Sequence, residues 1–276
     1  MDEKLLARIA EALERIAPAS ADPTDLTSAP AYVWDGKIAH TVDAFAPARY
    51  DLLSGIDEQK ERLLENTRRH AAGLPAHDAL LWGARGTGKS ASVGSVIGQL
   101  QREGTDIALM QCTADHIDSL PCFFALMRTV DRPFILFIDD LGFDEQSSGA
   151  DARVLRSLLD GGASARPANV RLYVTSNRRH ILPRSLSEQD DPINRRDVVD
   201  DKMALSDRFG LSLGFHNMDQ DAYIAIVAGY AQHFGLTFEP LDAVQWATQR
   251  GSRSGRVAWQ YVTELAGRQG KSLTAS

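Results

Sequence analysis

The sequence predicts an α/β protein in which a three-layer αβα unit, built on a mainly parallel sheet, is followed by a small helical domain. Three observations lead to this prediction. Short apolar runs alternate with helical stretches between residues 78 and 176, a glycine-rich segment at 83–90 joins one apolar run to one helical stretch, and the strand pattern stops after residue 215. Such alternation is typical of βαβ units, whose helices cover both faces of a parallel sheet.

Length and composition agree with this class. A chain of 276 residues, 43% apolar and 24% charged, suits one large globular domain with a smaller appendage. The net charge of −7 argues against a surface made mainly for polyanions, although it leaves room for a local basic groove. The N-terminal residues lack the apolar core of a secretory signal, and the apolar runs are too short to span a bilayer, so we expect a cytoplasmic protein without membrane contact.

The chain divides into four predicted parts. Residues 1–17 form a short amphipathic helix, because apolar residues recur at helical spacing until Pro18. Residues 18–30 are rich in Pro, Ala, Ser and Asp and are predicted to be a linker. Residues 31–216 carry the α/β unit, and residues 217–276 form a helical lid domain. The two cysteines, Cys112 and Cys122, show no zinc or disulfide pattern and are expected to be core thiols.

The predicted elements follow in order. The strands of the α/β unit are expected at 79–82, 107–112, 134–139, 170–176 and 211–215. Its helices are expected at 89–102, 115–130 and 152–160, and those of the lid at 219–234, 239–250 and 255–268, with Gly235 and Gly251 as stops. The highly charged segment 184–202 is predicted to be a surface loop.

One motif carries most of the chemical information. Residues 83–90 fit the phosphate-loop (P-loop) pattern GxxxxGK[ST], directly after a strand and at the start of a helix. In such a loop, backbone N–H groups surround phosphate oxygens and glycines let the backbone approach them. Its predicted cofactor-binding residues are Gly83, Ala84, Arg85, Gly86, Thr87, Gly88, Lys89 and Ser90. Lys89 is expected to reach the β- and γ-phosphates, and Ser90 to offer its hydroxyl to Mg²⁺.

Two acids end the apolar strand at 134–138. Asp139 is predicted to hold Mg²⁺ through water, and Asp140 to orient the attacking water or accept its proton. The alternative is a buried strand with a polar exit turn. Asn177 follows the strand at 170–176 and could position a water beside the γ-phosphate, but Asn is also an ordinary turn residue, and both interpretations stay open.

Arginines form two later clusters. Arg208 lies in the string LSDRFGL, while Arg253 and Arg256 lie in RGSRSGRV, directly before and within the start of the last predicted helix. Guanidinium groups suit phosphate oxygens, so either cluster could contact a triphosphate. Surface ion pairing with the excess acids is the alternative, and spacing alone favours it.

The order of these motifs resembles the AAA+ superfamily over residues 52–270. The resemblance implies ATP and Mg²⁺ as cofactors, ATPase activity, and a homo-oligomeric ring or open ring. It also implies that Asn177 is sensor 1, that Arg256 or Arg253 is the lid sensor, and that Arg208 is an arginine finger acting on a neighbour's ATP. The segment with Gly55 and Ile56 looks like the one that contacts adenine. More narrowly, the strings LLWGARGTGKS, FILFIDDLGF, VTSNRRH, LSDRFGL and RGSRSGRVA resemble a bacterial family of uncharacterised AAA+-type ATP-binding proteins.

Two departures from the superfamily pattern refine the expected function. Asp140 stands where glutamate is usual, which predicts slow hydrolysis or a switch, since a misplaced base lowers rate steeply. The aromatic–apolar–Gly loop of threading unfoldases is missing after residue 112, and Phe123 and Phe124 are expected in the core. A clamp, loader or remodeller is therefore favoured over an unfoldase.

Three functions remain in competition. The first is ATP-driven remodelling, clamping or loading of an unknown macromolecular client. The second is a slow or non-hydrolysing ATP-gated switch that recruits a partner protein through the N-terminal helix. The third is a nucleic-acid or helicase loader, which the acidic net charge disfavours; it would use Arg178, Arg179, Arg195 and Arg196. A small-molecule kinase would explain neither Asn177 nor the lid arginines.

Overall fold

A computed structural model describes residues 24–141, 155, 159, 166–177 and 207–273 of the chain. The predicted helix at 1–17, most of the predicted helix at 152–160 and the predicted charged loop at 184–202 lie outside these residues. Within the described part, no helix has the length and apolar composition that crossing a membrane requires.

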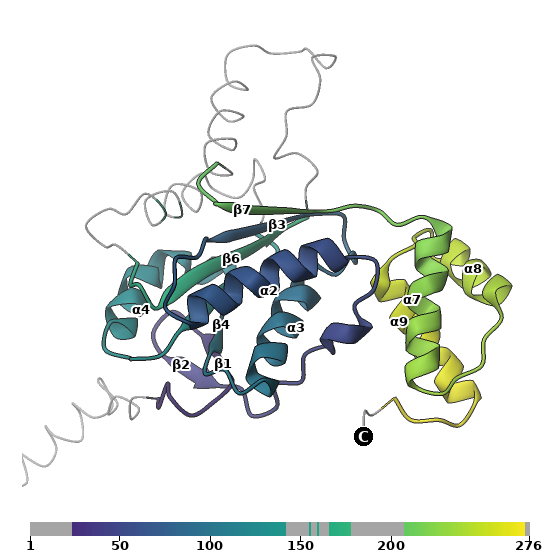
Figure 1. The fold of residues 1–276 in the computed structure, drawn as a ribbon, viewed down its shortest axis with the longest axis horizontal. Coiled ribbons are helices and arrows are strands. Elements are labelled where there is room, and N and C mark those ends of the chain that lie inside the picture. The colour runs from purple at the N-terminus through teal and green to yellow at the C-terminus, as the bar shows by residue number, and fades with distance from the viewer. Residues whose placement is uncertain (1–23, 142–154, 156–158, 160–165, 178–206, 274–276) are drawn as a thin grey trace, which may run out of the picture.

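A seven-stranded sheet is the centre of the α/β unit, with the order β2-β1-β4-β5-β6-β3-β7 (Figure 1). Only the pair of β1 and β2 is antiparallel; the other neighbours are parallel. The strands are β1 (Ala31–Trp34), β2 (Ala39–Thr41), β3 (Ala79–Gly83), β4 (Ala108–Cys112), β5 (Phe134–Ile138), β6 (Val170–Ser176) and β7 (Leu211–Phe215). The mainly parallel sheet and its five predicted strands are therefore confirmed.

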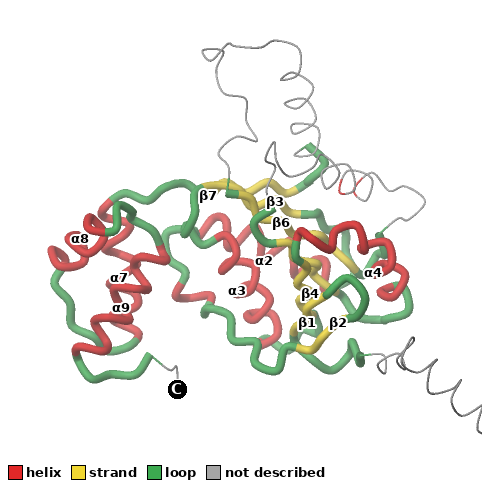
Figure 2. The backbone as a smooth tube through the Cα atoms, turned by 180° about the vertical axis from the view of Figure 1, so that it is seen from behind, coloured by secondary structure: helices red, strands yellow, loops and turns green. Residues whose placement is uncertain are grey.

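Helices cover both faces of this sheet, as the two opposite views show (Figures 1 and 2). One face packs against α2 (Asp57–Ala71) and α3 (Lys89–Arg102), and the other against α4 (Leu120–Met127). Within β5, Leu136 belongs to the core on the α4 side and Phe137 to the core on the α2 and α3 side, because successive side chains of a strand point to opposite faces. The three-layer αβα architecture follows from these two apolar cores.

The position of β6 determines which side chains can meet. It pairs with β5 on one side, where Ile138 lies opposite Val174, and with β3 on the other, where Leu81 lies opposite Thr175. Parallel strands have their carboxyl ends at one edge of the sheet, where ligands bind in open α/β folds. The residues after β5 and β6 therefore lie beside the glycine-rich loop that follows β3.

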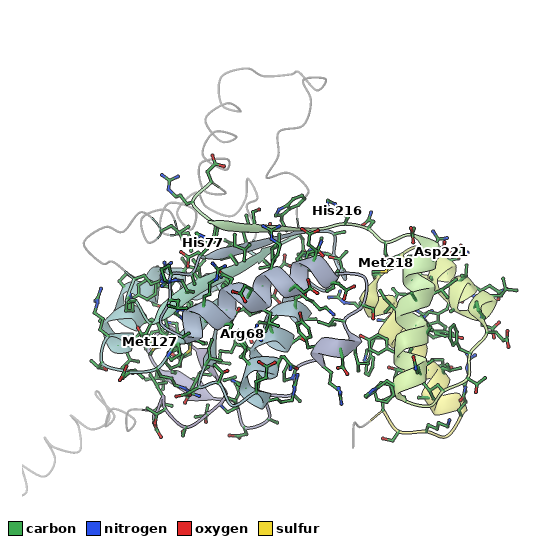
Figure 3. The ribbon with its side chains drawn as sticks, in the orientation of Figure 1. Arg68, His77, Met127, His216, Met218 and Asp221 are labelled. Carbon is green, nitrogen blue, oxygen red and sulfur yellow. The ribbon has the colours of Figure 1, made fainter. Side chains whose placement is uncertain are left out.

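The lid domain consists of α7 (Gln220–His233), α8 (Pro240–Gln249) and α9 (Gly255–Arg268), which pack around a core of their own. The connection from β7 to α7 passes His216 and Met218, which Figure 3 labels. Asp219 caps α7 by accepting the N–H of Ala222 at 2.8 Å. Ser254 caps α9 in the same way, with its Oγ 3.3 Å from the nitrogen of Val257. The three predicted lid helices are confirmed to within one or two residues.

Some sequence expectations need correction. The predicted helix at 115–130 is a 3₁₀ helix, η2 (Ala114–Ser119), followed by the shorter α4, since Pro121 has no N–H and is accommodated only in a first helical turn. Cys112 is buried, and burial raises the pKa of its thiol to about 12, but Cys122 is exposed rather than in the core. The strands β1 and β2 and the helix α2 were not predicted. Phe123 and Phe124 lie in the core as expected.

The described end of the predicted linker, residues 24–30, packs on the α/β unit. Leu26 is buried in the core on the α4 side. The buried guanidinium group of Arg132 donates to the carbonyl oxygens of Leu26 at 3.1 Å and Ala29 at 2.8 Å, and to the Asp106 carboxylate at 2.7 Å. These contacts fix the entry of the chain into β1.

Candidate nucleotide site

The glycine-rich loop between β3 and α3 is held in a conformation that only glycine adopts easily. Gly86 and Gly88 have φ angles of 77° and 101°, in the left-handed region. A Cβ on Gly86 would lie 2.9 Å from the Ser254 hydroxyl of the lid, and the Thr87 hydroxyl donates to the Ala84 carbonyl oxygen at 2.8 Å. The loop is therefore held by a hydrogen bond between two of its own residues, and the N-terminal end of α9 lies directly beside it.

The ammonium group of Lys89 is buried inside this loop. Its three N–H groups donate to the carbonyl oxygens of Gly83 at 2.9 Å and Ala84 at 2.8 Å, and to Asn177 Oδ1 at 3.0 Å. Burial lowers the pKa of Lys89 below its ordinary value, while the Asp140 and Asp139 carboxylates act in the opposite direction. An anionic ligand that replaced one of these oxygens would compensate a cation that has little contact with water.

Asp139 lies directly after β5 and faces the first turn of α3. Its Oδ1 accepts the Ser90 hydroxyl and the Thr175 hydroxyl, each at 2.6 Å. Mg²⁺ prefers oxygen ligands and is held in many phosphate-binding sites by one or two protein side chains. A carboxylate and a hydroxyl joined at hydrogen-bond distance beside a phosphate-type loop fit such an ion, so Ser90 and Asp139 are the residues that could hold it.

Asp140 adopts a left-handed conformation with φ of 52°, which Asp tolerates better than most residues. Its N–H donates to Thr175 Oγ1 at 2.8 Å, and its carboxylate accepts the side-chain amide of Asn177. Arg85 lies 3.9 Å from the same carboxylate. Asn177 thus bridges Asp140 and Lys89, its amide nitrogen on the acid and its amide oxygen on the ammonium.

These groups open into a cavity of about 840 Å³ between the P-loop and the lid. One end is polar and contains Lys89, Ser90, Asp139, Asp140 and Asn177. The other end is mainly apolar and aromatic; it is lined by Leu52, Leu53, Tyr230, Phe234, Trp259 and Leu273, together with Arg49 and His233. A cavity with a charged end at glycine-rich backbone and an aromatic end suits a ligand with phosphates and a flat ring.

The expected adenine segment lies just beside this cavity. Leu52 and Leu53 line it, whereas Gly55 and Ile56 are not among its lining residues. Ile56 packs against the loop instead, since its Cδ1 lies 3.1 Å from the point where a Cβ on Gly88 would be. Gly55 faces Ile226 of the lid, 3.8 Å from such a Cβ.

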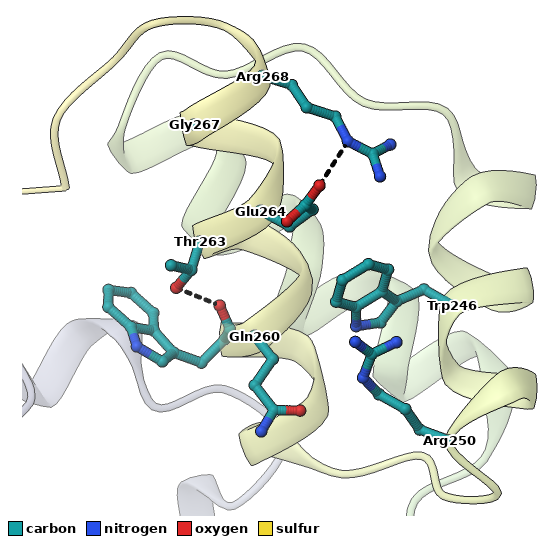
Figure 4. Close-up of a pocket in the computed structure, with 8 residues that line it drawn as sticks. Trp246, Arg250, Gln260, Thr263, Glu264, Gly267 and Arg268 are labelled. Atoms are coloured by element: carbon teal, nitrogen blue, oxygen red, sulfur yellow. Dashed lines mark hydrogen bonds and ion pairs between the residues drawn. The ribbon is translucent and has the colours of Figure 1, made fainter.

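The lid arginines have different positions. Arg256 lines the cavity, and its backbone N–H donates to the Gly86 carbonyl oxygen at 3.4 Å. Arg253 is exposed and is not a lining residue. Arg250, from the same cluster, stacks 3.4 Å above the ring of Trp246 in a second cavity of about 810 Å³ on the lid (Figure 4). The structure thus brings only Arg256 of this cluster to the cavity beside the P-loop.

Arg208 lies before the first residue of β7, at the opposite end of that strand from the P-loop, because Phe215 at its end pairs with Gly83. The five residues of β7 span about 16 Å. Arg208 does not line the cavity of its own subunit. The predicted nucleic-acid arginines, Arg178, Arg179, Arg195 and Arg196, lie outside the described residues.

Sequence reasoning missed two parts of the site. Thr175, two residues before Asn177, contacts both acids, yet a threonine within a strand is common and gives no signal by itself. The other part is an aromatic wall made of Tyr230 in α7, Phe234 directly after this helix and Trp259 in α9. Its side chains look like any helix core in the sequence, so only the packing of the lid reveals them.

Comparisons with known proteins agree with this fold. A family model described as "Protein of unknown function (DUF815)" matches residues 27–269. No curated protein matches the sequence. The chain is similar in structure to the RuvB Holliday junction branch migration motor of Thermotoga maritima, with a TM-score of 0.51 and 17% identity, covering 82% of this chain and 68% of that one.

It is also similar to the ORC1 protein of Aeropyrum pernix, whose structure is a complex with DNA. The TM-score is 0.53 with 15% identity, covering 83% of this chain and 66% of that one. At such identities the likeness concerns the fold alone. The fold is that of the AAA+ P-loop proteins, as the sequence predicts.

Proposed function

This chain belongs to the family described as "Protein of unknown function (DUF815)", and we propose that it is an ATPase. In this proposal it couples binding and hydrolysis of MgATP to remodelling, clamping or loading of a macromolecular client. The single observation that carries the proposal is the polar end of the cavity. There Lys89, Ser90 and Asp139 lie beside Asp140 and Asn177, on three different segments that meet at one edge of the sheet.

Each of these residues has a chemical task that its position supports. Lys89 neutralises charge on the phosphates, and the backbone N–H groups of the P-loop bind their oxygens. Ser90 and Asp139 would hold Mg²⁺, which when bound supplies positive charge to the phosphate oxygens. Asp140 orients the attacking water or accepts its proton, and Asn177 fixes the Asp140 carboxylate through its amide.

Arg208 supports an assembly in which neighbouring subunits share a site. It lies at the far end of β7 from the P-loop of its own chain, so it is badly placed to contact its own γ-phosphate. A head-to-tail ring would bring this end of one subunit to the cavity of the next. An arginine supplied in this way stabilises the charge of the transition state for phosphoryl transfer.

A mixing experiment with two inactive variants tests both parts of the proposal. Phosphate release from MgATP is measured for the wild type, for Arg208→Ala, for Lys89→Ala and for an equal mixture of the two variants. Each variant alone is expected to lose about 10³-fold in turnover. The mixture is expected to recover roughly a quarter of wild-type turnover, since half of the subunits keep the P-loop and half of their neighbours keep the arginine.

Arg62→Ala is the matched control, because Arg62 is an exposed arginine on α2 that pairs with Glu58 at 3.6 Å, and neither residue lines the cavity. This variant should keep wild-type turnover. Full activity of Arg208→Ala alone would reject its role as a finger. A mixture as inactive as its components would reject shared sites.

A second candidate function is favoured by Asp140. This acid is one methylene shorter than glutamate, sits in a left-handed turn and is tied to Asn177, which limits its reach toward a water. The chain would then be an ATP-gated switch that recruits a partner. A wild type that binds MgATP in titration calorimetry but releases no phosphate in this assay would support the switch over the ATPase.

A further inference from the structure

Thr175 occupies a central place in the site that the nucleotide chemistry described above does not use. It is buried in β6, with 1% of its surface exposed, and lies opposite Leu81 of the strand that leads into the P-loop. The ladder between β5 and β6 ends at Ile138 and Val174, one residue earlier. Thr175 is therefore the first residue of β6 that can contact the chain after β5 has ended.

Its contacts reach three consecutive residues of the turn after β5. The hydroxyl contacts Asp139 Oδ1 at 2.6 Å and the nitrogen of Asp140 at 2.8 Å, and the carbonyl oxygen accepts the N–H of Leu141 at 2.9 Å. A hydroxyl has one proton to give. Since an ionised carboxylate only accepts, Thr175 donates to Asp139 and accepts from Asp140, so the two bonds fix each other's direction.

The Thr175 hydroxyl holds the two acids in different ways, Asp139 by its carboxylate and Asp140 by its backbone. Asp139 Oδ1 receives Thr175 from one side and Ser90 from the other, so the carboxylate is aligned with the other predicted metal ligand. The hydrogen bond from its backbone N–H to Thr175 holds Asp140 in a conformation with φ of 52°. Residues other than glycine seldom adopt this conformation unless the surrounding structure supports it. One buried hydroxyl thus contacts the carboxylate of Asp139 and the backbone that carries the carboxylate of Asp140.

We propose that Thr175 is a positioning residue that orients Asp139 for Mg²⁺ and Asp140 for hydrolysis, acting through its hydroxyl. This inference rests on the proposed function, since it assigns a role within the same site. Hydrogen-bond partners of metal ligands typically change metal affinity by about 10- to 100-fold when they are removed. The hydroxyl, rather than the bulk of the side chain, carries the effect.

The test measures affinity for ATP by titration calorimetry, once with Mg²⁺ and once with EDTA, and takes the ratio of the two dissociation constants. In the wild type, Mg²⁺ is expected to tighten binding. Thr175→Val keeps the shape of the side chain and removes the hydroxyl; it should reduce the Mg²⁺-dependent gain by about 10-fold while leaving affinity in EDTA within about 2-fold. Thr175→Ser should restore the wild-type ratio.

Thr67→Val is the matched control. Thr67 is also a buried threonine with two hydrogen bonds, to the Leu63 carbonyl oxygen at 2.7 Å and the Tyr173 hydroxyl at 2.8 Å, but it lies on α2 away from the cavity. This variant is expected to lose stability without changing the ratio. A purely structural role for Thr175 would make both valine variants behave alike.

The outcomes separate this inference from the proposed function. A wild type that binds no ATP under either condition removes the proposed function and the inference with it. A wild type with Mg²⁺-enhanced binding and a Thr175→Val variant with the same enhancement overturns the inference alone. If Thr175→Val does not fold, Thr175→Ala replaces it, and failure of both to fold beside a folded Thr67→Val also overturns the role proposed for the hydroxyl.

Discussion

Arg253 and Arg256 are separated by two residues, and their surroundings differ because a helix begins between them. Ser254 is the N-cap of α9, so Arg253 precedes the helix and projects into solvent, whereas Arg256 lies in its first turn above the P-loop. The backbone of Arg256 contacts Gly86, and its side chain lines the cavity that holds Lys89. The pair therefore offers a natural comparison of two arginines in one short segment.

We predict that Arg256→Ala weakens MgATP binding by about 10-fold or more, because a hydrogen bond to a charged group contributes about 1.5–3 kcal/mol. Arg253→Ala should leave binding within about 2-fold, since Arg253 does not line the cavity and an exposed cation away from the ligand contributes little. Dissociation constants from competition with a fluorescent ATP analogue measure both. Equal losses in the two variants would contradict the assignment of Arg256 as the lid sensor.

At this scale, the sequence is most informative where a motif restricts residue type strongly. Lys89, Ser90, Asp139 and Asn177 were predicted from strand ends and the glycine pattern, and they do meet in one cavity. Tyr230 and His233 could not be predicted, because apolar residues are spread around α7 and no single face stands out. Which side chains of α7 line the cavity is decided by how the lid packs on the α/β unit.

At the scale of elements, burial explains which strands and helices can be predicted from the sequence and which cannot. The strands β3 to β7 are apolar runs of five to seven residues, long enough to be recognised. The strands β1 and β2 have four and three residues and show no usable period. Helix α2 buries polar side chains: Asn66, Thr67 and His70 contact the sheet, and Lys60 contacts Tyr50. Its pattern therefore lacks the apolar stripe of an ordinary surface helix.

His70 connects α2 to the sheet and gives this contact a pH dependence. Its Nε2 lies 3.0 Å from the Phe134 carbonyl oxygen, and its side chain is buried. Burial, reinforced by the nearby Arg171 cation, lowers the pKa of His70 from 6.5 to about 4. The unfolded chain therefore binds a proton between pH 6.5 and pH 4 that the folded chain does not, and stability must fall as the pH falls through this range.

We expect this single group to reduce the free energy of unfolding by about 3 kcal/mol between pH 6.5 and pH 4. His70→Gln removes the titrating group while keeping an N–H donor, so its stability should depend less on pH in the same range. Urea unfolding of both proteins at several pH values gives the difference. Parallel pH profiles for the two proteins would show that His70 is not the group responsible.

At the scale of the whole molecule, the α/β unit and the lid have separate cores, and the cavity beside the P-loop lies where they meet. The polar end belongs to the α/β unit, while most of the aromatic end belongs to α7 and α9. A ligand that contacts both the α/β unit and the lid stabilises the lid positions in which it makes the most contacts. Its phosphates can therefore shift the equilibrium between lid positions. This is the physical basis on which ATP could drive work on a client.

The most direct test of this account is titration calorimetry of MgATP into the wild type and into Lys89→Ala. Lys89 donates to three oxygens at the base of the cavity, so its removal should weaken binding by at least about 10-fold. Lys37→Ala, an exposed lysine between β1 and β2, is the control and should bind as the wild type does. No heat with the wild type, or equal affinity in Lys89→Ala, would contradict a nucleotide site at the P-loop.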